Sequence, residues 1–166
     1  MFALGLPLTP SDAPSAEQLP NGTIFVCADD DAAGRAGCKG LLKQACLNTN
    51  HDCSHFFGKT YEEAINLPCI VMELAAVHGH KAVVCIFDQH MDRYKEGAVY
   101  GTDVTKKLRD QGFKGVILIR SANDDAKSAT SYRNAGATAH LSKSERVADV
   151  AHTLVAQYSQ WARYAW

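Results

Sequence analysis

Polar side chains that could do chemistry together follow the short apolar runs of this 166-residue sequence. Three consecutive aspartates, Asp29–Asp31, follow the run IFVCA, and Asp88 follows AVVCIF. Two later runs, VILI and TAHL, are followed one residue on by Ser121 and Lys143. Carboxylates that converge cannot all stay ionised without a cation, and oxygen ligands favour a hard ion. These residue types therefore predict a Mg²⁺ site with a hydroxyl and an amine beside it, while Asp31 by itself is expected to cap a helix.

The elements that must position these groups alternate along the chain from residue 23 onward. Apolar runs rich in β-branched residues predict strands over 24–28, 53–57, 82–87, 116–119 and 138–141. Segments of helical period predict helices over 32–47, 60–78, 102–111, 125–135 and 145–163. Such alternation is typical of an α/β fold, and its size favours a flavodoxin-like (βα)5 doubly wound parallel sheet with strand order 2-1-3-4-5. The strands of such a sheet end at one edge, where the polar groups would face one another.

Charge and composition exclude several other classes of protein. The net charge of −1, from 17 Lys and Arg against 18 Asp and Glu, gives no general attraction to nucleic acid or to an acidic membrane. No apolar run approaches the roughly 18 residues of a membrane span, and no secretory signal opens the sequence. We therefore expect a cytoplasmic protein with no nucleic-acid or membrane partner. The six cysteines form no C-x-x-C pair and predict free thiols.

Composition also divides the chain into three parts. Four of the five prolines lie in the first twenty residues, which hold no basic residue, so a flexible tail is expected over 1–22. The alternating elements predict one domain over 23–160. The remaining residues, 161–166, form an aromatic tail that holds both tryptophans, and such residues are enriched at protein contacts.

Four segments, taken in order, resemble the motifs of the receiver domain of two-component response regulators (CheY-like). They are VCADDD, IFDQHM, ILIRSAN and GATAHLSK, and the resemblance spans residues 23 to about 157. It implies that Asp88 accepts a phosphoryl group from the phosphohistidine of a histidine kinase or a histidine phosphotransfer protein. It also implies that Asp29 and Asp30 hold Mg²⁺ together with Asp88 and the backbone carbonyl of His90. The phrases IRSAN and YGTDVTKKLRDQGF are similar to receivers of eukaryotic hybrid kinases.

The same resemblance implies a molecular switch. Lys143 would pair with the phosphoryl group, Ser121 would donate a hydrogen bond to it and move toward it, and His140 stands where the family has its switch aromatic. The family signals rather than acting as an enzyme on other molecules, since it catalyses only its own phosphorylation and dephosphorylation. Two departures are Asp92 and Ser144, which stand where the family has proline. Ser144 removes the expected cis peptide bond, because such a bond is costly before a non-proline residue.

Other functions stay open at the level of the sequence. A receiver-like binding module that has lost phosphotransfer is one alternative. Residues 24–36 also resemble the D-x-D-x-A-G-R stretch of Toprim nucleic-acid enzymes, but the only upstream glutamate is Glu17, which follows no apolar run. The sequence is compatible with a stand-alone regulator and with part of a hybrid kinase. For either, the surface of the fourth helix, fifth strand and fifth helix is expected to contact a second copy or the parent chain.

Overall fold

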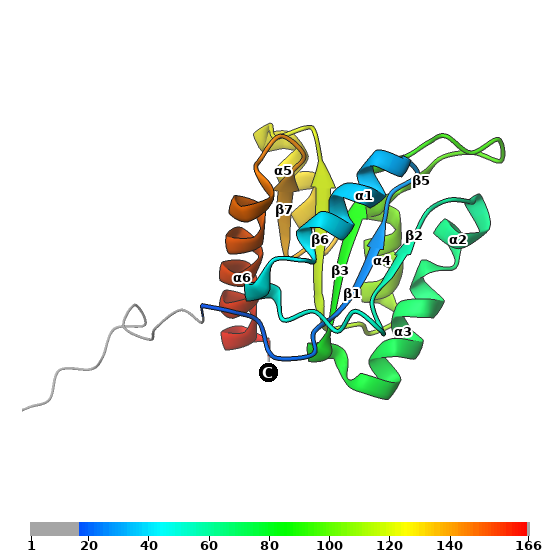
Figure 1. Cartoon of the computed structure of the whole chain (residues 1–166). Coiled ribbons are helices and arrows are strands. Elements are labelled where there is room, and N and C mark those ends of the chain that lie inside the picture. Colours follow the sequence, from blue (N-terminus) through cyan, green and yellow to red (C-terminus); the bar gives the residue numbers. More distant parts are fainter. Residues whose placement is uncertain (1–16, 166) are drawn as a thin grey trace, which may run out of the picture.

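A five-stranded parallel sheet forms the centre of the computed structural model, which describes residues 17–165 (Figure 1). Its strands are β1 (Ile24–Ala28), β2 (His55–Phe57), β3 (Val83–Asp88), β6 (Val116–Ser121) and β7 (Ala139–Ser142). They lie in the order β2-β1-β3-β6-β7 and every neighbouring pair is parallel. In chain order this arrangement is 2-1-3-4-5, so the predicted fold class and strand order are confirmed.

Helices cover both faces of the sheet (Figure 1). They are α1 (Ala32–Leu41), α2 (Tyr61–Ile65), α3 (Leu67–His78), α4 (Gly101–Asp110), α5 (Ala126–Asn134) and α6 (Val147–Tyr164), with short 3-10 turns η1 (Ala45–Leu47) and η2 (His80–Ala82). Side chains alternate across β1: Val26 belongs to a core shared with α3 and α4, and Phe25 to one shared with α1 and α6. Burial on both faces explains why the three central strands β1, β3 and β6 are mostly apolar.

Two predicted helices differ from the structure. The helix expected over 32–47 ends at Leu41, and Leu47 reaches the core from a separate 3-10 turn. A continuous helix would turn Leu47 about 140° away from Leu42, because each residue rotates about 100°. The helix expected over 60–78 is two helices that meet at Asn66, with Pro68 in the first turn of the second, where its missing N–H costs nothing.

The predicted tails are partly built into the domain. Leu19, within the segment expected to be flexible, is 2% exposed, and its N–H donates to the carbonyl of Cys46 at 2.8 Å. At the other end α6 runs through to Tyr164, so the expected boundary at residue 161 falls inside a helix. Trp161 packs against the core, whereas Tyr164 is 74% exposed. Residues 1–16 and Trp166 lie outside the described part of the chain.

A two-stranded hairpin follows the third strand of the sheet and was not expected. β4 (His90–Met91) pairs antiparallel with β5 (Val99–Tyr100), and residues 89–100 together are called the arm below. Figure 1 shows this segment reaching away from the sheet beside the carboxyl ends of the strands. Its base is anchored by Met91, which is fully buried in the core. The arm therefore sits at the edge of the sheet where the polar residues were predicted to gather.

Two smaller expectations also have outcomes. All six cysteines are free, as predicted. The bond between Lys143 and Ser144 is trans, since the described residues contain no cis peptide.

None of the helices described over residues 17–165 combines the length and apolar character that crossing a membrane requires.

Candidate functional site

Three carboxylates converge at the carboxyl ends of the first two central strands. Asp29 and Asp30 follow β1, and Asp88 is the last residue of the neighbouring β3, whose Phe87 is paired with Ala28. One oxygen from each carboxylate lies within 4.8 Å of the others. Asp29 and Asp88 are buried, at 2% and 7% exposed. The parallel register therefore brings together the acids that the sequence predicted.

Lys143 completes the cluster from the far side. It follows β7, and its backbone N–H donates to the carbonyl of Ser121 at 3.0 Å. Its Nζ lies 2.8 Å from Asp88 Oδ1 and 3.2 Å from Asp29 Oδ2. Burial lowers the pKa of Lys143, but its contacts with Asp88 and Asp29 reverse this effect and hold that pKa above its ordinary value. These contacts therefore favour the protonated amine, which lies between two acids.

The electrostatics of Asp88 favour a second cation. Burial raises the pKa of Asp88, the bond from Lys143 opposes this rise, and the neighbouring charge of Asp29 reinforces it. Three carboxylates and one ammonium leave the cluster with excess negative charge. Its donors are all oxygen atoms, which match a hard divalent ion such as Mg²⁺ better than a soft metal. The residues present therefore fit the ion that the sequence predicted.

Ser121 and His90 line the same hollow, a polar cavity of about 280 Å³. Ser121 is 3% exposed, and its Oγ accepts the N–H of Asn123 at 3.1 Å. The carbonyl of Gln89 accepts from Gly101 at 3.1 Å. Hydrogen-bonded pairs alternate in an antiparallel ladder, so the next residue, His90, directs its carbonyl away from β5. All the residues predicted for catalysis and metal binding thus border one cavity.

His140, the residue expected to be a switch, lies outside this cavity. It belongs to β7 and is paired with Ile119, two residues before Ser121 along β6. Its ring centroid lies 5.3 Å from that of Tyr132, and its Nε2 lies 3.4 Å from Asp124 Oδ1. A separate hollow between α5 and α6 borders this side chain. His140 therefore faces Asp124 in the loop after β6, and the other oxygen of that carboxylate accepts from the Ser142 hydroxyl at 2.9 Å.

Asp31 occupies the N-cap position of α1, as predicted, but its carboxylate makes no capping hydrogen bond. It pairs instead with the arm, with Arg93 Nη1 lying 3.0 Å from Asp31 Oδ1. The backbone N–H of Asp31 donates to Asp29 Oδ1 at 2.9 Å. Thus Asp31 contacts the acidic cluster through its backbone N–H and the arm through its side chain.

Three glycines that the sequence analysis did not identify make room for the acids. A Cβ at Gly34 would overlap the carboxylate of Asp29. A Cβ at Gly101 would lie 2.6 Å from the carbonyl oxygen of Asp88, and one at Gly58 2.5 Å from that of Asp29. Gly58 also has φ of +106°, which favours glycine. The only signal in the sequence is the phrase AAGRAG inside a predicted helix, where glycine is otherwise unfavourable.

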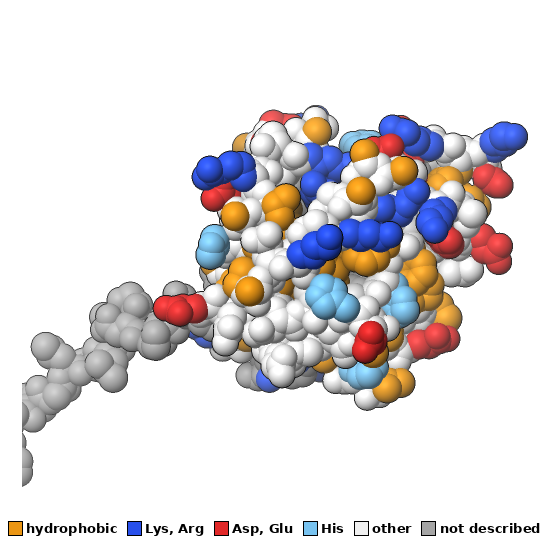
Figure 2. All heavy atoms as spheres, in the orientation of Figure 1, with side chains coloured by type: hydrophobic (Ala, Val, Ile, Leu, Met, Phe, Trp, Pro, Cys, Tyr) orange, Lys and Arg blue, Asp and Glu red, His pale blue; other side chains and the backbone are white. Residues whose placement is uncertain are grey.

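Basic side chains gather on the face of the domain that carries α1, the helix that begins just after Asp31. Figure 2 shows Lys and Arg side chains gathered over the face of the molecule that carries α1. Helix α1 contains two basic residues: Arg35 donates to the carbonyl of Asp29 at 2.7 Å, and Lys39 Nζ lies 5.3 Å from the ring centroid of Phe56. A group of basic side chains on one face attracts anionic molecules to that face.

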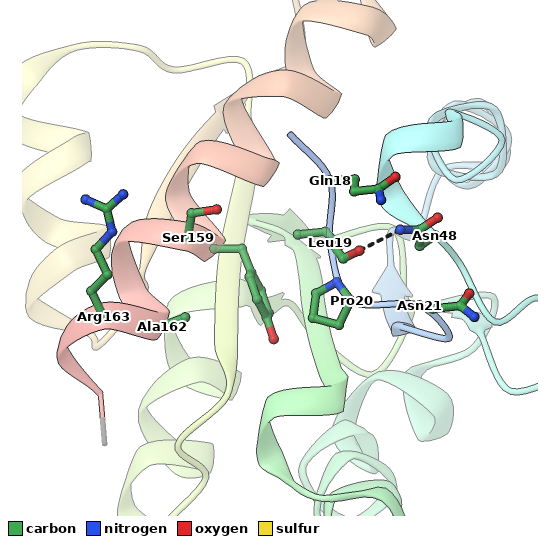
Figure 3. A pocket seen from close by; sticks show the side chains of 9 residues that line it. Gln18, Leu19, Pro20, Asn21, Asn48, Ser159, Ala162 and Arg163 are labelled. Atoms are coloured by element: carbon green, nitrogen blue, oxygen red, sulfur yellow. Dashed lines mark hydrogen bonds between the residues drawn. The ribbon is translucent and has the colours of Figure 1, made fainter. Parts of the chain in front are cut away.

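A larger hollow, of about 500 Å³, lies at the opposite end of the sheet (Figure 3). It separates the segment before β1 from the end of α6, and its wall is mainly apolar. Its lining residues are Gln18, Leu19, Pro20, Asn21, Asn48, Tyr158, Ser159, Ala162 and Arg163. Among residues 17–165, none that lines it carries a carboxylate or an imidazole. The larger hollow therefore lacks the groups for acid–base or metal chemistry.

Comparisons with known proteins identify the fold. No protein-family model matches the sequence, and no curated protein matches it. The structure is similar to the Francisella response regulator 1452 receiver domain, with a TM-score of 0.57 at 18% identity, covering 84% of this chain and 98% of the other. A response regulator receiver domain protein (CheY-like) from Methanospirillum hungatei JF-1 gives 0.59 at 14% identity, covering 86% and 98%. The chemotaxis response regulator CheY4 of Vibrio cholerae gives 0.57 at 18%, covering 81% and 97%. The chain has the fold of response regulator receiver domains.

Proposed function

We propose that this chain is a phosphoacceptor in a two-component phosphorelay. In this proposal Asp88 takes a phosphoryl group from the phosphohistidine of a histidine kinase or histidine phosphotransfer protein. The observation that carries the proposal is the position of Asp88, which ends β3 between the amine of Lys143 and the carboxylates of Asp29 and Asp30. The basic face around α1 further suits the approach of an anionic donor.

The transfer needs positioning and charge neutralisation more than covalent help. An Asp88 oxygen attacks phosphorus, a new O–P bond forms, the N–P bond to the donor breaks, and the histidine nitrogen leaves with the bonding pair. Asp29 and Asp30 would hold Mg²⁺ with Asp88 and the carbonyl of His90. When bound, the ion neutralises charge on the transferring phosphoryl oxygens. Lys143, already 2.8 Å from Asp88 Oδ1, would pair with another phosphoryl oxygen.

Ser121 would report the phosphoryl group to the rest of the domain. Its Oγ accepts the N–H of Asn123, which leaves its own hydroxyl proton to be donated. A phosphoryl oxygen in the cavity would accept a hydrogen bond from that hydroxyl and draw Ser121 toward Asp88. The backbone bond from Lys143 to the Ser121 carbonyl connects this movement to β7, and so to His140. The surface formed by α5, β7 and α6 is then the route to a second copy or to a parent chain.

Acetyl phosphate tests the proposal without the cognate kinase. In the presence of Mg²⁺ the protein should gain one labile phosphoryl group, observed by intact-mass spectrometry. Removal of Mg²⁺ or the change Asp88→Asn should abolish the gain. Asp110→Asn, at the end of α4, is the matched control and should label normally. Undiminished labelling of Asp88→Asn would overturn the assignment, and no labelling of the wild type would favour a receiver-like binding module.

A further inference from the structure

The arm after β3 contacts the candidate cation site at one of its ligands. The N–H of Arg93 donates to Asp30 Oδ2 at 2.8 Å. This bond uses one of the two Asp30 oxygens and fixes the rotation of the carboxylate. Asp30 is the least enclosed of the three acids, so it depends most on such a bond for a defined orientation. The donor is a backbone group, so its position depends on how the arm itself is held.

Tyr94 fixes that position. Its hydroxyl donates to the carbonyl of Gly58 at 2.7 Å, and its ring packs against the core. Burial raises the pKa of Tyr94 above its ordinary value, which keeps the hydroxyl protonated as a donor. Gly58 lies directly over the backbone of Asp29, where a Cβ would lie 2.5 Å from the Asp29 carbonyl oxygen. Tyr94 therefore ties the arm to the loop after β2, which packs against the backbone of Asp29.

A further contact of the arm is electrostatic and more exposed. Arg93 Nη1 lies 3.0 Å from Asp31 Oδ1, but the Arg93 side chain is 66% exposed. An ion pair so open to water contributes little to holding a segment in place. Its guanidinium also adds positive charge beside a site that would bind a cation. The backbone N–H of Arg93 thus favours cation binding by orienting Asp30, whereas its charged side chain disfavours cation binding.

We propose that the arm is a positioning element for the cation, with Tyr94 as its positioning residue. Tyr94 holds the Arg93 N–H against Asp30, so that the Asp30 carboxylate is oriented before the ion arrives. Preorganised ligands bind more tightly because less freedom is lost on binding. The Arg93 side chain contributes no orientation to Asp30. This inference rests on the proposed function, since it concerns the same cation site.

Direct binding of Mn²⁺, used as a paramagnetic substitute for Mg²⁺, tests the inference apart from phosphorylation. Free Mn²⁺ is measured by electron paramagnetic resonance for the full chain and its variants. Tyr94→Phe removes only the hydroxyl and should weaken binding about three- to tenfold, as expected for the loss of one hydrogen bond. Tyr61→Phe is the matched control, since its ring lies edge-on to Tyr94 at 6.0 Å and it should bind like the wild type. Arg93→Ala keeps the backbone N–H and should bind at least as tightly as the wild type.

A second readout separates positioning from a general loss of structure. The rate of labelling by acetyl phosphate is measured against Mg²⁺ concentration for wild type and Tyr94→Phe. The Mg²⁺ concentration at half-maximal rate should rise in the variant, while the rate at saturating Mg²⁺ should stay the same. Equal Mn²⁺ binding by wild type and Tyr94→Phe, or weaker binding by Arg93→Ala than by Tyr94→Phe, would overturn the inference. Failure of the wild type to bind Mn²⁺ at all would instead overturn the cation site of the proposed function.

Discussion

The two ends of the parallel sheet contain hollows of opposite character. At the carboxyl end a cavity of about 280 Å³ gathers three aspartates and a lysine. At the amino end a hollow of about 500 Å³ is lined mainly by apolar groups, among them Leu19 and Tyr158 (Figure 3). The larger hollow lies between the segment before β1 and the last turns of α6. The comparison teaches that a reactive site is recognised by polar groups that converge on one point, and not by the volume of its cavity.

This contrast makes a simple expectation for variants. Changes at the amino end should lower the stability of the domain and leave phosphoryl and cation chemistry unchanged. Changes at the carboxyl end should alter that chemistry, with effects on stability that depend on the cation. The four variants below, taken from the largest expected effect to the smallest, test this separation.

The largest effect is expected for Leu19→Ala at the amino end. Leu19 is 2% exposed and packs in the core shared with α1 and α6. Truncation of such a side chain costs about 2 to 4 kcal/mol of unfolding free energy, which urea denaturation would measure. Val77→Ala, at a side chain that is 77% exposed, is the control and should change stability by less than about 0.5 kcal/mol. Loss of labelling in folded Leu19→Ala would break the separation between the two ends.

The second effect concerns stabilisation by Mg²⁺ at the carboxyl end. A ligand that binds only the folded state at about 100 times its Kd stabilises it by about 2.7 kcal/mol. The melting temperature of the wild type should therefore rise in millimolar Mg²⁺. Asp30→Ala should melt higher than the wild type without Mg²⁺, because repulsion with Asp29 and Asp88 is relieved. An Asp30→Ala variant that still responds to Mg²⁺ as the wild type does would contradict the account.

The third effect compares two glycines of the same helix, α1. Gly34→Ala should displace the carboxylate of Asp29, which a Cβ would overlap, and weaken Mn²⁺ binding about 10- to 100-fold, as disturbed ligand support does in metal sites. A Cβ at Gly40 would meet no atom within 4 Å, so Gly40→Ala should leave binding unchanged and add about 0.5 to 1 kcal/mol of stability. Similar binding by the two variants would show that Gly34 has no role in the site.

The smallest effect is expected for Tyr158→Phe at the amino end. The Tyr158 hydroxyl donates to the carbonyl of Lys81 at 2.9 Å, so its loss should cost about 1 kcal/mol. Burial raises the pKa of Tyr158, so its contribution is fully present below the ordinary value of about 10 and is lost as the pH rises through the higher folded-state pKa. The stability difference between wild type and Tyr158→Phe, measured by urea denaturation, should therefore shrink above pH 10. A constant difference would refute this account of the hydroxyl.

The sheet was predictable because its signal is local. Runs such as IFVCA and AVVCIF are buried on both faces, so their composition alone indicates parallel strands. The acids and Lys143 could be found because they stand at the ends of those runs. The breaks after Leu41 and at Asn66 were missed because helical period continues through both, and only the packing of Leu47 and the position of Pro68 explain them.

The arm and the glycines could not be predicted for a different reason. The arm is held by contacts between residues far apart in the chain, such as Tyr94 with Gly58 and Arg93 with Asp30. No periodic pattern marks a hairpin whose strands are two residues long. Glycine is required at position 34 only because a Cβ there would overlap the carboxylate of Asp29. Such features depend on tertiary contacts, which cannot be predicted from the helix or strand propensity of single segments.

The most direct test of the account locates the phosphoryl group in the wild-type chain. After treatment with acetyl phosphate and Mg²⁺, borohydride reduces an aspartyl phosphate to homoserine, and peptide mapping by mass spectrometry identifies the converted residue. The account predicts one homoserine, at position 88, in the peptide that joins β3 to the arm. Conversion at Asp29, Asp30 or any other aspartate, with Asp88 intact, would contradict the claim that the carboxyl end of the sheet is built around Asp88 as its phosphoacceptor.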